Sequence, residues 1–209
     1  MTKLTLIIAA LTLSLNVMAS DKAKKGPSKV EAKLDTAAST ATWVGKKVTG
    51  SHTGKVAFKD GEFEYKNGSV AKGEVEIDLT SISDTDQTDA DYNKKLVTHL
   101  KSEDFFDVAK YPTATFKIKS LSEIHNIVAG QPNLEATGTL TIHGVTKPYS
   151  TKLFFTPNDN GFEAKGKLVI DRTLFGLKYK SKKFFDIKEL GDKMIDDNFE
   201  VDFNLVAKK

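Results

Sequence analysis

Apolar and polar residues alternate over long stretches from residue 36 to the end of the chain, which is the period of strands with one buried face. Around residue 76, for example, Val75, Ile77 and Leu79 share one parity, while Glu74 and Glu76 occupy the other. The pattern predicts about eight strands, near residues 36–45, 47–59, 70–79, 112–121, 134–142, 149–155, 162–170 and 199–205.

The segments between these stretches carry residues that favour tight turns. Asp60-Gly61 and Asn67-Gly68 are turn dipeptides, and residues 144–148 and 158–161 separate two further pairs of strands. No strand–helix–strand unit occurs, so the chain is predicted to be all-β and antiparallel. About eight such strands predict an antiparallel barrel, whose interior is either filled by side chains or holds one small ligand, as in lipocalins. Strands of about ten residues with Ala and Gly pointing inward favour the ligand-holding case.

Residues 84–110 interrupt the alternation. They are acidic at first and then place Tyr92, Leu96 and Leu100 at helical spacing, followed by Phe105 and Phe106. We therefore expect a short helical insertion of one or two helices, packed over the sheet or across the barrel mouth.

Three predicted strands share the pattern Ala-x-Gly-x-aliphatic-x-Ile, with Gly73, Gly138 and Gly166 at the second marked position. All marked positions have the same parity, so they face the same side of the sheet. The glycines either relieve bends as the barrel coils, or leave a cavity open at one end because side chains are missing there. Both interpretations can hold together.

Several phenylalanines are adjacent in sequence, as in Phe154-Phe155. Successive side chains of a strand point to opposite faces, so one of these two must lie on the outer face or beneath a loop. The phenylalanines form either a plain core or a lid of the kind an apolar ligand requires.

Composition excludes several function classes. The 209 residues include 31 basic and 28 acidic ones, a net charge of +3, and Arg172 is the single arginine. This weak charge and shortage of arginine argue against nucleic acid as a partner. The chain has no cysteine, which excludes disulfides, thiolate metal sites and cysteine nucleophiles.

Residues 1–19 have the pattern of a secretory signal peptide. Lys3 precedes an apolar stretch, and cleavage is expected after Ala19. The alternative, a membrane anchor, needs roughly 20 apolar residues, more than the stretch offers. Residues 20–35 are rich in lysine and predict a flexible lead, so the domain is expected to span residues 36–209.

Motifs for catalysis or metal binding are weak. His52, His99, His125 and His143 lie far apart without ligand spacing, so no metal site and no cofactor is predicted, although they could converge in space. The acidic residues 84–91 lack the glycine and glutamate of a calcium loop. They are interpreted as a solvated loop whose Asp or Thr caps the following helix, with a weak cation site as the alternative.

Seven short motifs together resemble the YceI-like family, also called the polyisoprenoid-binding or lipid-binding family. Each motif is weak alone, but the set extends from about residue 36 to the end of the chain. The motifs are WVG at 43–45, TGSHTG at 49–54, IDLTSI at 77–82, HLKSEDFFD at 99–107, YPTATF at 111–116, GTLTIHGVTK at 138–147 and IDRTLFG at 170–176.

This resemblance implies an extended lipocalin-like antiparallel barrel in the bacterial periplasm. It implies that an apolar lumen holds a long isoprenoid, such as a polyprenyl phosphate or a quinone-like lipid, without catalysis. A homodimer and transient contact with a membrane are further expectations.

The residues expected to bind the ligand are mostly apolar. Arg172 is included because its fork suits a phosphate head group, and the alternative for it is an ion pair with Asp171 or another carboxylate. The candidates for the lumen or its lid are Phe58, Val75, Ile77, Leu100, Phe105, Phe106, Phe116, Leu140, Leu168, Phe175 and Arg172.

Two other functions stay open. One is an interaction or stress-response module whose barrel is filled by side chains. The other is an enzyme acting on a lipid or small molecule, which would need His52, His99 or His143 beside a carboxylate in a pocket.

Overall fold

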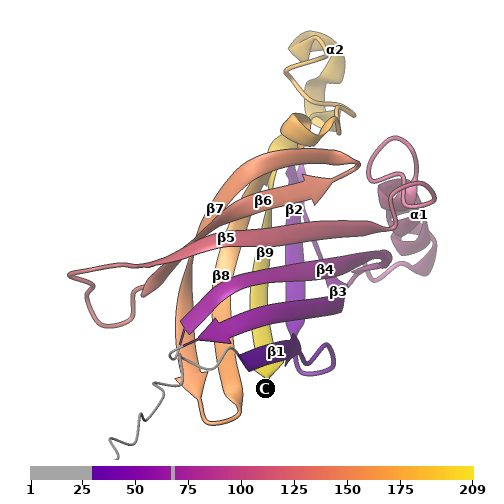
Figure 1. Cartoon of the computed structure of the whole chain (residues 1–209). Helices are drawn as coiled ribbons and strands as arrows, with labels where there is room; N and C mark the ends of the chain where they lie inside the picture. The colour runs from indigo at the N-terminus through magenta and orange to yellow at the C-terminus, as the bar shows by residue number, and fades with distance from the viewer. Residues whose placement is uncertain (1–29, 67–68) are drawn as a thin grey trace, which may run out of the picture.

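Eight antiparallel strands close into a barrel in the computed structural model, which describes residues 30–66 and 69–209 (Figure 1). Neighbours follow the order β3-β2-β9-β8-β7-β6-β5-β4, and β4 pairs with β3 to close the ring. The prediction of an all-β, eight-stranded antiparallel barrel is confirmed. The strands are β2 (Thr40–Lys47), β3 (Gly50–Lys66), β4 (Ser69–Asp84), β5 (Thr113–Glu123), β6 (Leu134–Ile142), β7 (Val145–Asn158), β8 (Gly161–Asp171) and β9 (Ile195–Lys208).

A ninth, short strand, β1 (Val30–Leu34), continues the line of β2 between β3 and β9. The two strands are separated at Asp35–Ser39, where the Ser39 side chain accepts a hydrogen bond from the backbone N–H of Val206 at 2.9 Å. The flexible lead predicted for residues 20–35 is therefore wrong for the five residues of β1. Residues 20–29 of that lead, and the signal peptide predicted for residues 1–19, lie outside the described residues.

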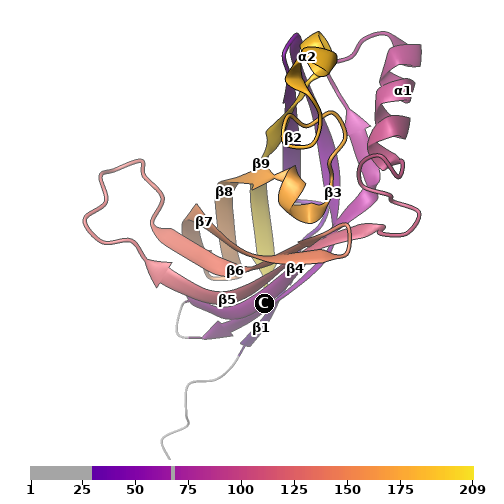
Figure 2. The ribbon, with the colours of Figure 1, turned by 90° about the horizontal axis from the view of Figure 1, so that it is seen from above.

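The helical segments of the described residues lie at one end of the barrel, called the mouth here (Figure 2). Helix α1 (Ala90–Lys101) follows β4, inside the insertion predicted for residues 84–110. Asp89 caps it by accepting hydrogen bonds from the backbone N–H groups of Asp91 and Tyr92, as expected of the acidic loop. The link from β8 to β9 is a second covering segment that the sequence pattern did not predict; it holds η1 (Arg172–Phe175), α2 (Ile187–Leu190) and η2 (Gly191–Lys193).

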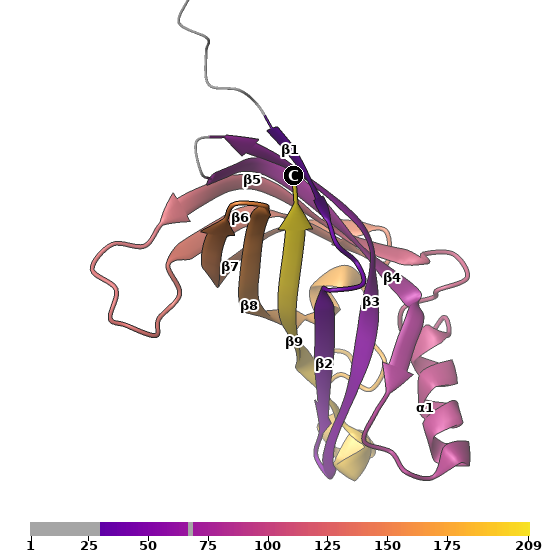
Figure 3. The same cartoon turned by 90° about the horizontal axis from the view of Figure 1, so that it is seen from below.

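The opposite end carries β1 and the C-terminus (Figure 3). Aromatic rings of the buried core close it. The ring of Phe162 lies 5.0 Å from that of Phe63 and 5.1 Å from that of Phe155, between centroids. A Cβ at Gly73 would lie 2.5 Å from the Phe63 ring, and one at Gly166 would lie 2.6 Å from the Phe203 ring. These two glycines therefore make room for rings, and the interpretation that they leave a cavity open is wrong.

Two turn assignments differ from the sequence patterns. Asp60-Gly61 lies inside β3, paired with Glu76 and Val75 of β4, so it forms no turn. The register shifts just before it, between Phe58 and Asp60, where Lys59 is the extra residue of a bulge. The β6–β7 turn consists of His143 and Gly144, both with positive φ, so residues 145–148 belong to β7. Asn67-Gly68 lies outside the described residues.

On the outer face, Glu200 of β9 joins the strands on either side of it. Its carboxylate accepts hydrogen bonds from Lys46 of β2 at 2.8 Å and from Lys167 of β8 at 2.7 Å. The bonds from Lys167 and Lys46 lower the pKa of Glu200 to about 2. The carboxylate is therefore ionised at any ordinary pH and keeps both lysines in place.

The adjacent phenylalanines of β7 predict a contrast in stability. Phe155 is 9% exposed and packs on Phe162, whereas Phe154 is 41% exposed, as expected for one member of the pair. Phe155→Ala should lower the free energy of unfolding by about 3–5 kcal/mol, because it empties part of the closed end. Phe154→Ala, the matched control, should change it by no more than about 0.5 kcal/mol. Urea denaturation measures both, and equal losses would contradict the packing described.

Candidate functional site

A cavity of about 550 Å³ lies inside the barrel and reaches from its closed half to the mouth. Along β9 its wall extends from Ile195 to Leu205, ten residue steps. At roughly 3.3 Å per residue and a strand tilt of 35–45°, this corresponds to a depth of about 25 Å. Spread over that depth, the volume forms an elongated cavity, which fits an extended ligand better than a round one.

Most of the wall is apolar, and several inward side chains are incompletely covered. Phe199, Val201 and Phe203 alternate on the inner face of β9, line the cavity and yet remain only half-buried. An inward side chain keeps accessible surface only when no neighbouring side chain fills the space in front of it. The barrel is therefore hollow, which rules out the alternative of an interior filled by side chains.

Ten of the eleven residues predicted from the sequence lie on the cavity wall. Phe175 is the exception: it is the last residue of η1, is completely buried and packs in the core instead. The ten are Phe58, Val75, Ile77, Leu100, Phe105, Phe106, Phe116, Leu140, Leu168 and Arg172. Their role in ligand binding stays a prediction.

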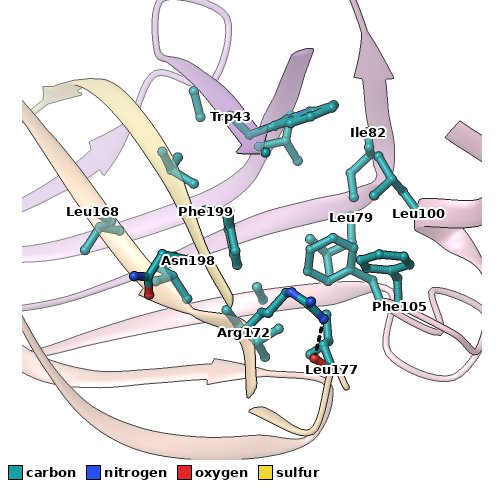
Figure 4. Close-up of a pocket in the computed structure, with 18 of the residues that line it drawn as sticks. Trp43, Leu79, Ile82, Leu100, Phe105, Leu168, Arg172, Leu177, Asn198 and Phe199 are labelled. Carbon is teal, nitrogen blue, oxygen red and sulfur yellow. Dashed lines mark hydrogen bonds between the residues drawn. The ribbon is translucent and has the colours of Figure 1, made fainter. Parts of the chain in front are cut away.

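Sequence reasoning missed part of the wall. Trp43 of β2 lies at the mouth end with Ile82 and Leu100 around the same space (Figure 4). The sequence shows Trp43 only as part of the WVG motif. Its parity matches that of Ala41, which also lines the cavity, and this parity indicates that Trp43 faces inward. The alternation of Phe199, Val201 and Phe203 was equally visible and would have placed β9 in the lumen.

Three rings connect the two segments that cover the mouth. His99 of α1, Phe105 from the turn after α1 and Tyr179 from the β8–β9 link form an aromatic bridge. The His99 ring lies 4.6 Å from that of Tyr179 and 5.1 Å from that of Phe105, both edge-on, and the Phe105 and Tyr179 rings are 5.5 Å apart. Such pairs contribute about 0.5–1.5 kcal/mol each beyond their buried area, so the two covers hold each other.

The buried side chain of Arg172 joins the start of the β8–β9 link, the second cover, to β9. It is 3% exposed, and its guanidinium donates to the backbone carbonyls of Leu177 at 2.7 Å, Asp196 at 2.9 Å and Ile195 at 3.2 Å. Burial lowers the pKa of Arg172, and the carboxylate of Asp197, 3.8 Å away, acts against that shift. These contacts favour the ion-pair interpretation over a head-group contact.

Asp171, the other proposed partner of Arg172, pairs with a lysine instead. Its carboxylate accepts hydrogen bonds from Lys183 at 2.6 Å and from Thr173. Burial would raise the pKa of Asp171, but the bonds from Lys183 and Thr173 outweigh it and leave the pKa below its usual value. Lys183 thereby fixes the second cover to the end of β8.

Polar side chains gather where the cavity meets solvent. Lys47, Lys180 and Lys193 line this part of the wall, together with His52. The sequence did not anticipate where His52 lies: its Nδ1 is 3.3 Å from the carboxylate of Asp86 and 3.7 Å from that of Asp84. Among the described residues, no helix is long and apolar enough to cross a membrane.

A closed antiparallel barrel with an elongated apolar cavity and a covered mouth defines a barrel of the ligand-binding class. Comparison with protein-family models matches residues 33–207 to the YceI-like domain. The chain belongs to the YceI-like family, and the resemblance seen in its motifs is confirmed.

Individual relatives agree with this assignment. Protein YceI of Escherichia coli O6:H1 is 38% identical over 116 residues, which cover 52% of this chain and 54% of that protein. The chain thus spans about half the length of the curated relatives it matches. BcnA of Burkholderia cenocepacia has a similar fold at 23% identity, with a TM-score of 0.61 over 84% of this chain and 99% of BcnA.

A second solved structure is described as a polyisoprenoid binding domain from Saccharophagus degradans implicated in plant cell wall breakdown. It has a TM-score of 0.58 at 19% identity and covers 85% of this chain and 97% of that domain. At this identity the likeness, as for BcnA, concerns the fold.

The buried contacts of Arg172 give a stability prediction. Arg172→Lys keeps the charge but cannot reach three carbonyls on two segments, so unfolding free energy should fall by about 2–4 kcal/mol. Lys188→Arg, at an exposed position of the same link, should change it by no more than about 0.5 kcal/mol. Chemical denaturation compares the two, and an unaffected Arg172→Lys would mean that the guanidinium does not hold the link to β9.

Proposed function

We propose that this protein is a periplasmic carrier that holds a long-chain isoprenoid lipid in the barrel cavity and performs no chemistry on it. The observation that carries the proposal is the hollow apolar interior, about 550 Å³ in volume, with half-buried Phe199, Val201 and Phe203 on its wall. The isoprenoid class is supported by the family and by the description of the Saccharophagus degradans domain as polyisoprenoid binding.

Burial of hydrocarbon alone supplies enough free energy for such binding. Each buried carbon contributes about 0.8 kcal/mol, so a five-carbon isoprene unit contributes roughly 4 kcal/mol. The ordering cost of association is about 4–15 kcal/mol, which a few buried units offset. The tail therefore needs no polar partner deep in the cavity, and cavity depth would select chain length.

The mouth carries a surface suited to a lipid membrane, from which such a ligand would come. Five exposed apolar side chains there form what we call the mouth patch. The β8–β9 link, residues 172–194, has seven basic and three acidic residues, a net charge of +4. The mouth patch consists of Val48, Leu174, Phe184, Phe185 and Ile187, which are between 47% and 59% exposed.

Apolar side chains amid lysines are the composition that binds anionic bilayers, because the rings enter the interface while the lysines pair with lipid phosphates. We therefore propose that the mouth docks transiently on an anionic membrane and exchanges its ligand there. Export through a signal peptide cleaved after Ala19 is part of the same proposal. A homodimer remains an expectation from the family.

The carrier proposal is tested by the lipid that the protein retains. Protein isolated from the periplasmic fraction of its host should have the mass of a chain starting at Ser20 and should release an isoprenoid on organic extraction, detected by mass spectrometry. Leu168→Trp, which fills the cavity from β8, should reduce the retained lipid at least tenfold. Val169→Trp, at the neighbouring position whose side chain is 52% exposed, should retain it fully.

Circular dichroism establishes that both variants fold. A repeatedly empty extract from the unmodified protein, or equal lipid in the two variants, would overturn the carrier proposal.

Membrane docking is tested with liposomes. The protein should co-sediment with vesicles containing anionic phospholipid, less so with neutral vesicles or at high salt, because the lysine contribution is screened. Replacing Phe184 and Phe185 with Ser should weaken vesicle binding at least fivefold. Val128→Ser, which removes a 73% exposed side chain from the β5–β6 loop at the closed end, should leave it unchanged. Equal effects at both ends would disprove docking through the mouth.

A further inference from the structure

His52, Asp84 and Asp86 converge on one point beside the cavity mouth, although 32 residues separate His52 from Asp84. One ligand atom from each, a histidine nitrogen and two carboxylate oxygens, lies within 4.8 Å of the others. From this geometry we infer that the three side chains form a binding site for a divalent transition-metal ion of the zinc class.

The strongest support is the carboxylate of Asp84. Its side chain is completely buried, and its Oδ1 accepts hydrogen bonds from the backbone N–H of Gln87 at 2.8 Å and from the amide of Asn93 at 3.1 Å. Its Oδ2 is equally buried but has no hydrogen-bond partner among the described residues, and it lies 3.7 Å from His52 Nδ1. A buried carboxylate oxygen without a donor is costly, and a metal ion would satisfy it.

The spacing of the ligand atoms fits a metal ion. Two ligands about 2.0–2.1 Å from a tetrahedral metal lie roughly 3.3 Å apart. His52 Nδ1 lies 3.3 Å from Asp86 Oδ1 and 3.7 Å from Asp84 Oδ2, so its distance to each carboxylate is within a few tenths of an ångström of that spacing. Three protein ligands leave a further position for water or an anionic oxygen.

The surrounding backbone holds these residues in place. Asp84 ends β4 and pairs with Gly54 of β3, two residues from His52. The backbone N–H and the hydroxyl of Thr85 both donate to the carbonyl of Thr53, at 2.9 and 3.0 Å, which fixes the chain between the two aspartates. The Trp43 indole donates to the carbonyl of Ser83 at 3.1 Å and ties β2 to the same corner.

The ligand types indicate which metal. Imidazole nitrogen favours zinc, copper, nickel or iron, whereas calcium and magnesium prefer oxygen-only sites. A second His–carboxylate pair lies nearby and serves as a control: His99 Nε2 is 3.2 Å from Asp104, which is 59% exposed in its side chain. That pair has one carboxylate, so it should not bind a metal alone.

The inference is tested by isothermal titration calorimetry with zinc chloride. The purified chain carries no polyhistidine tag and is first treated with a chelator to remove bound metal. We expect one zinc per chain with micromolar or tighter affinity, weak or no heat with calcium or magnesium, and visible d–d absorption of a tetrahedral or five-coordinate site with cobalt(II). Loss of a partner outside the ligand set typically lowers metal affinity 10–100-fold, so loss of a ligand should lower it at least about 100-fold.

Three ligand variants and one control make the outcome decisive. His52→Gln, Asp86→Asn and Asp84→Asn should each reduce zinc affinity to that extent, while Asp104→Asn should leave it unchanged. Asp84 is buried, so if Asp84→Asn fails to fold by circular dichroism, the more exposed His52 and Asp86 still test the site. Absence of one-to-one zinc binding, or binding that survives both His52→Gln and Asp86→Asn, would overturn the inference without affecting the carrier proposal.

Discussion

Eight strands closed into a cylinder enclose more room than the inward side chains of this chain occupy, and the rest of the structure follows from that mismatch. Large rings of Phe63, Phe155 and Phe162 fill the closed end. On the cavity wall, by contrast, Phe199, Val201 and Phe203 of β9 keep accessible surface. An apolar surface in contact with water is unfavourable at about 25 cal/mol per Å². A hydrocarbon chain in the cavity would remove that cost without changing the fold.

The period of alternation predicted the barrel well because each long strand has one wet face and one dry face. The same parity placed Val75, Ile77, Leu140 and Leu168 correctly on the cavity wall. Parity does not report what lies opposite a side chain, so it could not show that Gly73 and Gly166 accommodate the rings of Phe63 and Phe203. A turn dipeptide is misleading for a similar reason: Asp60-Gly61 pairs with β4 inside a continuous β3, so no turn forms there.

Long-range contacts were beyond sequence reasoning. The link 172–194 has no clear period, so the sequence does not predict its role as a second cover. For Arg172 the sequence leaves a head-group contact and an ion pair open, and it gives no sign of the three backbone carbonyls that hold the guanidinium. The meeting of His52 with Asp84 and Asp86 depends on the register of β3 against β4, which no local pattern encodes. The features that the sequence did not predict therefore lie mostly at the mouth, because loops and strand ends from distant parts of the chain meet there.

The aromatic bridge has a consequence for how the barrel would open. His99 and Phe105 belong to the first cover and Tyr179 to the second, and all three rings touch. Moving either cover away from the other would therefore cost these ring contacts, about 0.5–1.5 kcal/mol each, so a displacement of one cover is coupled to the position of the other.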